Sequence, residues 1–361
     1  MNLEERKALT ASRKLDHLRI CLDEEIERGR TGFEDIRLVH NALPECDLGF
    51  IETATEFLGY SFRAPLFLAA MTGGHPDTKK VNGVLARAAE QTGIGMGVGS
   101  QRAALENPSL ADTFSVVRDE APRAFLAANI GVVQLRDHGL EWAEAAVEMI
   151  DADALCIHLN FLQEAIQPEG DHDARGCLDA LEELCTGFRL PVIVKETGSG
   201  ISAATAKVLW DAGVKAIDVG GWGGTNWAAI EGLRSGPVAG EVSTRPPLSE
   251  VFEDWGIPTA VSICEVAGTG GPVIATGGIR SGLDMAKALA LGADLCGVAL
   301  PFLAPAMKGE KELVDTISAF LRELRVAMFL SGAKNTVALK EKMPYITGVT
   351  REMIVTNWRN Q

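Results

Sequence analysis

Several features that would place this chain in a membrane or in an oxidising compartment are missing from its sequence. No apolar run among the 361 residues reaches the roughly eighteen that span a bilayer, and the charged start MNLEERK lacks the apolar core of a signal peptide. The seven cysteines are scattered and contain no CxxC pair. We therefore expect a cytoplasmic protein with reduced thiols and without a membrane partner.

Basic residues are also scarce. The chain has 34 Lys and Arg residues against 49 Asp and Glu residues, which gives a net charge of −15 at pH 7. Such an acidic surface repels nucleic acid, so we expect no nucleic-acid partner. An anionic small molecule remains possible, provided that a local cluster of cations binds it.

Eight apolar segments recur along the chain, and a helical pattern follows each of them. The predicted strands are residues 65–71, 93–98, 124–129, 154–160, 191–196, 216–221, 272–278 and 294–300. The predicted helices are residues 76–91, 109–119, 139–150, 174–186, 202–212, 247–266, 282–291 and 311–331. Near-continuous apolar strands are typical of a parallel sheet that is buried on both faces. Eight such repeats over about 265 residues favour a closed (β/α)8 TIM barrel within the α/β class.

The alternative fold is an open doubly wound sheet. That fold usually shows a GxGxxG turn after its first strand, and the chain contains none. We expect one domain in three parts: an N-terminal helical extension or lid at 1–60, a barrel at 61–331 and a C-terminal helical cap at 332–361.

Polar or glycine-rich sequences follow all eight predicted strands, at the end where such barrels carry their active residues. They are MTGG (71–74), GSQR (99–102), AANIG (127–131), HLNFLQE (158–164), KETGSG (195–200), GGWGGTNW (220–227), TGGIRSG (276–282) and GVALPF (297–302). A plain tight turn explains any one of these loops, but it explains all eight together less well. In TGGIRSGLD the glycines allow close approach of a ligand, and a helix that begins near Ser281 with a free N-terminus suits a phosphate.

Lys195 ends an apolar strand, where its charge needs a partner. It fits a substrate carboxylate, a Schiff base or the anionic form of a reduced flavin, and a structural salt bridge is the simpler alternative. The amide of Asn129 and the hydroxyl of Thr225 are candidates for the same ligand, although turn capping alone explains a threonine there.

Two further groups of polar residues are candidates for binding an anion. Near the N-terminus, SRKLDH places Arg13, Lys14 and His17 on one helical turn, where they form a diphosphate clamp or an ordinary solvated face. Arg102 stands at a strand end. In the stretch CIHLNFLQEA, four polar side chains follow a buried strand: His158, Asn160, Gln163 and Glu164.

These motifs together resemble one family. The chain resembles type 2 isopentenyl-diphosphate Δ-isomerase, the FMN-dependent form, over nearly its whole length. The resemblance rests on RKLDH, MTGG, GVGSQR, ANIG, HLNFLQE, QPEGD, KETGSG, DVGGWGGTNW, ATGGIRSG and FLSGAK, in that order. HLNxxQE together with RKxxH and GSQR is the specific part, whereas residues 233–248 match no motif.

The resemblance implies a redox-neutral reaction of isoprenoid biosynthesis in which isopentenyl diphosphate becomes dimethylallyl diphosphate. It implies reduced FMN as acid and base, Mg²⁺ on the diphosphate, NAD(P)H as a transient reductant, and a homotetramer or homo-octamer.

The resemblance also assigns residues to roles. It implies that the cofactor binds Met71, Thr72, Gly73, Ser100, Asn129, Lys195, Thr225, Gly277, Gly278, Arg280, Ala299 and Leu300. It implies that the substrate binds Arg13, Lys14, His17, Arg102, His158, Asn160 and Gln163. Of these, Gln163, His158 and Asn160 are the implied catalytic residues, and Glu164 is the implied ligand of Mg²⁺.

Rival functions on the same fold need residues that the sequence does not place suitably. An FMN-dependent 2-hydroxy acid oxidase needs a base, usually a histidine, beyond the fifth strand, and no histidine follows Lys195. A nucleotide dehydrogenase needs a nucleophilic cysteine near the sixth strand, and none lies between Cys185 and Cys264. A non-catalytic flavin-binding barrel has little use for Gln163 and Glu164.

Overall fold

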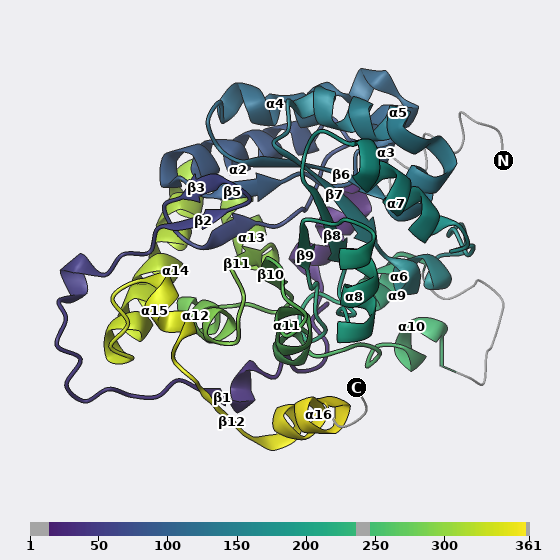
Figure 1. The fold of residues 1–361 in the computed structure, drawn as a ribbon. Coiled ribbons are helices and arrows are strands. Elements are labelled where there is room, and N and C mark those ends of the chain that lie inside the picture. Colours follow the sequence, from purple (N-terminus) through teal and green to yellow (C-terminus); the bar gives the residue numbers. More distant parts are fainter. Residues whose placement is uncertain (1–13, 236–245, 359–361) are drawn as a thin grey trace.

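Eight parallel strands close into a barrel in the computed structural model, which describes residues 14–358 apart from 236–245 (Figure 1). The strands are β4 (Leu66–Leu68), β5 (Gly95–Gly97), β6 (Leu126–Gly131), β7 (Ala154–Leu159), β8 (Val192–Glu196), β9 (Ala216–Asp218), β10 (Val273–Thr276) and β11 (Leu295–Val298). Strand β11 pairs with β4, and this pairing closes the ring. The predicted (β/α)8 barrel is therefore confirmed, and the open sheet is excluded.

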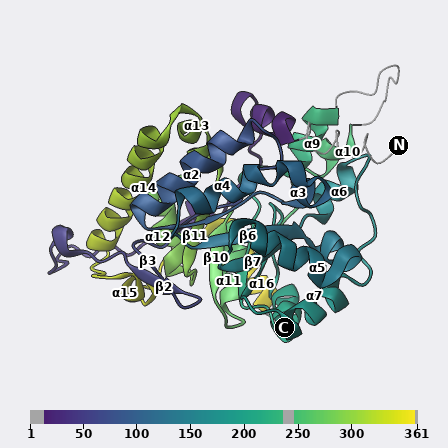
Figure 2. The same cartoon turned by 90° about the horizontal axis from the view of Figure 1, so that it is seen from above.

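A layer of helices surrounds the barrel and covers the apolar outer side of its strands (Figure 1). Its members are α2 (Thr78–Thr92), α4 (Asp112–Glu120), α5 (Val132–Ile150), α7 (Cys177–Gly187), α8 (Ala203–Asp211), α11 (Thr259–Ala267), α12 (Gly282–Ala290) and α14 (Glu310–Leu330). Figure 2 shows α13 (Leu300–Lys308) and α14 beside α2, where the last repeat meets the first.

The predicted helix boundaries were wrong at two glycine positions. Helix α5 begins at Val132, and Gly139, with φ 59° and ψ −149°, divides it into two segments. The second segment agrees with the predicted helix 139–150, whereas the first was not predicted. The predicted helix 247–266 is divided into α10 (Leu248–Val251) and α11, with Gly256 at φ 151° and the N-cap Pro258 between them.

The strands alternate their side chains between two environments. On β7, Leu155 and Ile157 pack outward in the layer beneath the helices, whereas Ala154 and Cys156 face the interior cluster. Because side chains of a strand alternate with a period of two, His158 continues the inward row of Cys156 at the carboxyl end.

A hairpin that the sequence did not predict packs against the barrel interior. It consists of β2 (Thr55–Phe57) and β3 (Tyr60–Phe62), and its rings Phe57 and Phe62 join Phe125 and other interior side chains. The hairpin therefore buries apolar interior residues at the end of the barrel opposite to the carboxyl ends of the strands.

Two short strands from the N-terminal and C-terminal parts of the described chain meet outside the barrel. Strand β1 (Ile36–Arg37) pairs antiparallel with β12 (Tyr345–Ile346), next to α16 (Gly348–Trp358), as Figure 1 shows. The short helix α15 (Thr336–Lys340) lies against α12. Of the predicted N-terminal helix, the structure describes residues 14–23.

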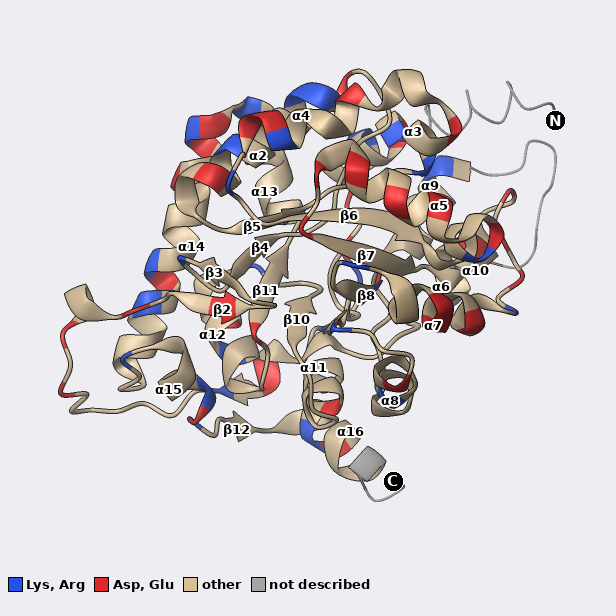
Figure 3. Ribbon diagram, turned by 45° about the horizontal axis from the view of Figure 1, so that its top comes forward, with Lys and Arg blue, Asp and Glu red and all other residues tan. Residues whose placement is uncertain are grey.

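The charged residues lie mainly on the outer helices and loops, and the barrel strands carry few of them (Figure 3). Within the described ranges, no helix combines the length and the apolar character needed to cross a bilayer.

Candidate active site at the barrel mouth

Two joined cavities open at the carboxyl ends of the strands. The larger, here called the glycine chamber, has a volume of about 1000 Å³ including its opening, and Gly220, Gly221, Gly277 and Gly278 contribute to its lining. The smaller, here called the polar chamber, has about 720 Å³, and its lining includes His158, Asn160, Gln163 and Glu164.

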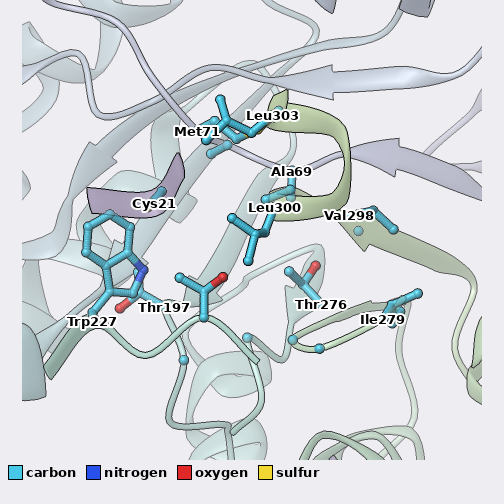
Figure 4. A pocket seen from close by; sticks show the side chains of 18 of the residues that line it. Cys21, Ala69, Met71, Thr197, Trp227, Thr276, Ile279, Val298, Leu300 and Leu303 are labelled. Atoms are coloured by element: carbon cyan, nitrogen blue, oxygen red, sulfur yellow. The ribbon is translucent and has the colours of Figure 1, made fainter. Parts of the chain in front are cut away.

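Seven residues line both chambers at their junction. They are Lys14 and His17 from the N-terminal helix, Ala70 and Met71 after β4, Lys195 at the end of β8, Thr197 after it, and Trp227 at the start of α9 (Trp227–Ser235). Figure 4 shows Met71, Cys21 and Trp227 around the glycine chamber, opposite Thr276 and Ile279. Two ligands, one in each chamber, would therefore contact each other at the junction beside Lys195 and Met71.

The glycine loop after β10 fits a phosphate. Gly277 and Gly278 have φ values of 118° and 65°, and a Cβ on Gly277 would lie 2.3 Å from the carbonyl oxygen of Gly221. In the described chain, the N–H groups of Gly277, Gly278 and Ile279 donate to no acceptor. Amide groups of this kind, left without acceptors beside a cavity, suit an anion.

The expectation of a free helix N-terminus after this loop was wrong. The side chain of Ser281 caps α12 by accepting from the N–H of Asp284 at 3.1 Å, and the N–H of Gly282 donates to Glu323 at 2.7 Å. Two N–H groups in the first turn of α12 are thus already occupied, and the preceding loop provides further donors. The guanidinium of Arg280, another predicted phosphate contact, pairs with Glu27, with Nε 2.8 Å from Oε1.

Most of the predicted cofactor residues line these chambers. The glycine chamber has Met71, Lys195, Thr225, Gly277, Gly278, Arg280, Ala299 and Leu300. The polar chamber has Ser100 and Asn129 in addition to Met71 and Lys195. Thr72 and Gly73 line neither: Thr72 is buried beneath the mouth, and a Cβ on Gly73 would overlap the ring of Phe114.

Lys195 is surrounded by buried carboxylates. It is in register with His158 on β7 and Asp218 on β9, and its Nζ donates to the carbonyl oxygen of Glu196 at 3.0 Å. Burial raises the pKa of Asp218 and raises that of Glu196 to about 7, while the charge of Lys195 opposes both shifts. Lys195 therefore lies beside two carboxyl groups, Glu196 and Asp218, and its proximity favours their ionised forms.

His158 is neutral and has a defined tautomer. Its Nδ1 lies 2.9 Å from Oδ1 of Asn129, whose Nδ2 donates to the carbonyl oxygen of Val98 at 3.0 Å. Asn129 therefore accepts from Nδ1–H, which leaves Nε2 of the neutral ring with a lone pair. Burial first, and then the nearby charges of Lys195 and Arg102, lower the pKa of His158 to about 3. Nε2 of the neutral ring and an ionised diphosphate oxygen are both acceptors. A hydrogen bond between them consequently needs a proton on one of the two atoms.

The short helix α6 (Phe161–Ile166) presents the remaining polar residues of CIHLNFLQEA. Nδ2 of Asn160 donates to Oε1 of Glu164 at 2.8 Å and lies 3.4 Å from Oε1 of Gln163. In the part of the chain that the structure describes, no three His, Cys, Asp or Glu side chains are grouped as a metal site. Glu164 provides one carboxylate toward the chamber, so coordination of Mg²⁺ by it remains a prediction.

Glu231 is a candidate residue of the site that the sequence analysis missed. It is fully buried on α9 and accepts from Nε2 of Gln163 at 2.7 Å, Nε of Arg234 at 2.6 Å and Nε2 of His17 at 2.9 Å. Although burial opposes it, these hydrogen bonds lower the pKa of Glu231 to about 2. A signal was present, since Glu231 lies one helical turn after Trp227 on an otherwise apolar face.

The predicted cationic residues come together only in part. Lys14 and His17 lie at the junction, and His17 packs edge-on against Trp227 with ring centroids 5.1 Å apart. Arg102 lines the polar chamber but already pairs with Glu106 at 2.9 Å and Asp171 at 3.3 Å. Arg13 lies outside the described residues.

The barrel fold is similar to that of several solved oxidase structures. A mandelate oxidase mutant with a monooxide FMN adduct matches with a TM-score of 0.62 and 20% identity, covering 92% of each chain. The lactate oxidase of Pediococcus acidilactici matches with a TM-score of 0.66 and 17% identity, covering 96% of this chain and 95% of the other. At this identity the similarity establishes the fold.

Sequence comparisons define the class and then the family. A family model described as FMN-dependent dehydrogenase matches residues 142–345, which makes the chain an FMN-type barrel protein. The isopentenyl-diphosphate delta-isomerase of Methanoregula boonei is 60% identical over 349 residues, 97% of each chain. That of Archaeoglobus fulgidus is 54% identical over 345 residues, 96% of this chain and 98% of the other. The chain belongs to the family of type 2 isopentenyl-diphosphate delta-isomerases.

Proposed function

We propose that this enzyme shifts the double bond of isopentenyl diphosphate to form dimethylallyl diphosphate without net oxidation, as a step of isoprenoid biosynthesis. The observation that supports this best is the joined pair of chambers. One fits a flavin with its phosphate at Gly277 and Gly278, and the other collects His158, Gln163 and Glu164. The family relatives carry the name of the same activity.

In this proposal the glycine chamber holds FMN. The N–H groups of Gly277 and Gly278 bind its phosphate, and Lys195 lies beside its ring and stabilises negative charge there. Reduced FMN, when bound, supplies an acid–base group and negative charge next to the alkene of the substrate. The wall of Met71, Leu300 and Leu303 excludes water from that face.

The polar chamber holds the diphosphate. Arg102 and Lys14 provide positive charge, and Asn160 and His158 provide further polar contacts. Glu164 provides a hard oxygen ligand, which suits a Mg²⁺ ion that takes its other ligands from the diphosphate and water. Arg13 is proposed for the same cluster on the strength of the family resemblance.

Gln163 is the group of this chain proposed to assist proton movement at the allylic carbon. Its Nε2 is fixed on the ionised Glu231, so its Oε1 points away from that carboxylate and lies near Nδ2 of Asn160. The amide is thereby oriented in advance, which reduces the entropy lost when substrate binds.

The proposal extends to the reductant and the assembly. NAD(P)H is expected to reduce the flavin as a transient visitor, since the chain has no dinucleotide fingerprint. A homotetramer or homo-octamer is expected, and light scattering of the purified protein measures it as a mass four or eight times the 38.5 kDa chain.

One assay tests the function. Purified protein is incubated without oxygen with FMN, dithionite, Mg²⁺ and isopentenyl diphosphate, and the product is identified by mass spectrometry after dephosphorylation and chromatography. Dimethylallyl product that requires reduced flavin supports the proposal. Absence of this product, or oxidation of a 2-hydroxy acid under air instead, would reject it.

The metal role is tested separately. Glu164→Gln is expected to raise the Mg²⁺ concentration needed for half-maximal activity about tenfold, because a neutral amide is a weaker ligand, while FMN affinity stays unchanged. Glu182→Gln, an exposed position on α7, is the control. Equal losses of metal dependence and FMN affinity in Glu164→Gln would contradict the assignment.

A further inference from the structure

A turn directly after α6 contacts several groups of the polar chamber. This turn, here called the brace turn, comprises residues 167–171 (QPEGD) and is closed by the N–H of Gly170, which donates to the carbonyl oxygen of Gln167 at 3.1 Å. At its start, Nε2 of Gln167 donates to Oε1 of Glu231 at 2.7 Å. In the middle, Glu169 accepts from Nη2 of Arg234 at 2.6 Å. The brace turn is thus anchored to α9.

The far end of the brace turn contacts a second group. Oδ2 of Asp171 accepts from Nη1 of Arg102 at 3.3 Å and from Nε2 of Gln134 at 3.2 Å. Arg102 and Gln134 both line the polar chamber, whereas Asp171 itself does not. Asp171 therefore acts on the chamber through its neighbours.

The backbone of the same residue holds Glu164. The N–H of Asp171 donates to Oε2 of Glu164 at 2.8 Å, while Nδ2 of Asn160 holds Oε1 at 2.8 Å. The contact requires close packing, because a Cβ on Gly170 would lie 1.9 Å from the carbonyl oxygen of Glu164. Both carboxylate oxygens of Glu164 are oriented before any ligand arrives.

The guanidinium of Arg102 is oriented in the same way. Glu106 holds its Nε at 2.9 Å and Asp171 holds Nη1, and Nη2 donates to no acceptor among the described residues. Because Nε and Nη1 of the planar guanidinium already donate to carboxylates, Nη2 is left to donate to an anion in the chamber. Fixing a flexible arginine beforehand lowers the entropy lost on binding.

We propose that Asp171 is a positioning residue that aligns Arg102 and Glu164 for one magnesium-bound diphosphate. This inference rests on the proposed function, because it assigns the diphosphate to the polar chamber. The opposite expectation is competition, in which the carboxylate of Asp171 weakens anion binding by neutralising Arg102.

Inorganic diphosphate with Mg²⁺ is the probe, and its affinity for the FMN-loaded protein is measured by calorimetry. Asp171→Asn is expected to weaken the affinity about tenfold, the usual effect of losing a charge-assisted hydrogen bond. Asp173→Asn is the matched control: the same substitution two residues on, where the carboxylate pairs only with the exposed Arg175, is expected to change the affinity less than about twofold. Unchanged or tighter binding by Asp171→Asn would overturn the proposal.

A double-mutant cycle with Arg102→Gln separates positioning from general damage. If Asp171 acts through Arg102, Asp171→Asn weakens diphosphate binding much less when Arg102 is already replaced. Additive losses would show a merely structural role and overturn the proposal. Calorimetry needs no turnover, so it tests the position of Asp171 independently of catalysis. If the isomerase assay fails but the double-mutant cycle still shows coupling between Asp171 and Arg102, the proposed function is rejected and the positioning role of Asp171 is retained.

The backbone contact has its own variant. Gly170→Ala displaces the N–H of Asp171 from Glu164 and is expected to raise the Mg²⁺ concentration needed for diphosphate binding several-fold, with FMN absorbance retained. Unchanged Mg²⁺ dependence in this variant would overturn the part of the proposal that concerns Glu164.

Discussion

His158 shows how the position of a residue on a strand determines its protonation. It ends the inward row of β7, so it is buried, and the register places it beside Lys195. A buried imidazole next to a lysine is more stable without its own positive charge. The sequence predicted that His158 faces the site, but only the contact with Asn129 determines which nitrogen carries the proton.

The depressed pKa of His158 predicts a pH dependence of folding stability. The folded pKa of about 3 lies below the ordinary value of 6.5, so the unfolded chain binds more protons between these values. The resulting stability is fully present above pH 6.5 and is lost as the pH falls toward 3. From this residue alone, the free energy of unfolding is expected to fall by about 2 kcal/mol between pH 7 and pH 5.

Urea unfolding of the wild-type protein and of His158→Gln at both pH values measures this loss. The variant lacks the titrating group, so its stability should depend less on pH by the same amount. Parallel pH profiles of the two proteins would contradict a neutral, buried His158.

Lys195 is predicted to act on the cofactor. Lys195→Ala is expected to weaken FMN affinity about tenfold, because a hydrogen-bond donor beside the ring is lost. Fluorescence titration of apoprotein with FMN measures this change, with Lys215→Ala at an exposed position as the control. Unchanged FMN affinity and an unchanged rate of flavin reduction would together argue against a contact between Lys195 and the ring.

At the scale of elements, hydrophobic periodicity predicted the repeated strands and helices. It did not predict features that depend on residues distant along the chain. Eight apolar strands and their helices were visible because each buries a regular face. The β2–β3 hairpin was missed because its strands have only three residues each. In addition, the rings of Phe57 and Phe62 pack against interior residues of the barrel that are distant along the chain. Glu231 was missed for the same reason, since its partners His17 and Gln163 lie far away along the chain.

The glycine loop after β10 carries a prediction of its own. Gly277→Ala is expected to weaken FMN binding at least tenfold or to lower stability by about 2 kcal/mol, because the residue has a left-handed φ and no space for a Cβ. Gly187→Ala, whose Cβ would meet nothing within 4 Å, is expected to leave both unchanged or slightly improved. FMN titration and thermal unfolding measure these changes. If Gly277→Ala has the FMN affinity and the thermal stability of the wild-type protein, the loop has room for a Cβ and the prediction is wrong.

At the scale of the molecule, the sequence predicted the barrel and its mouth but not the junction between β1 and β12 outside it. The hydroxyl of Thr350 on α16 donates to Oδ2 of Asp35 at 2.9 Å, beside the β1–β12 pair. Two short strands of two residues each carry too little pattern to be recognised from sequence.

This junction is expected to contribute to global stability. Thr350→Val removes a buried hydroxyl and its hydrogen bond to Oδ2 of Asp35, which keeps the backbone N–H of Thr350 as a donor, so the free energy of unfolding should fall by about 1 kcal/mol. Thr356→Val on the exposed side of α16 is the control, since its hydroxyl bonds only within the helix, to Glu352. Equal stabilities of the two variants would mean that the junction of β1 with β12 unfolds independently of the barrel.

The junction also has a consequence for synthesis of the protein. Ile36 pairs with Ile346, so β1 leaves the ribosome roughly 310 residues before its partner, which at about 5–20 residues per second is a delay of roughly 15 to 60 seconds. Closure of the barrel itself waits for β11 to reach β4. Throughout that interval the nascent chain exposes the apolar residues of its first strands, which makes this period the one in which a chaperone is most useful.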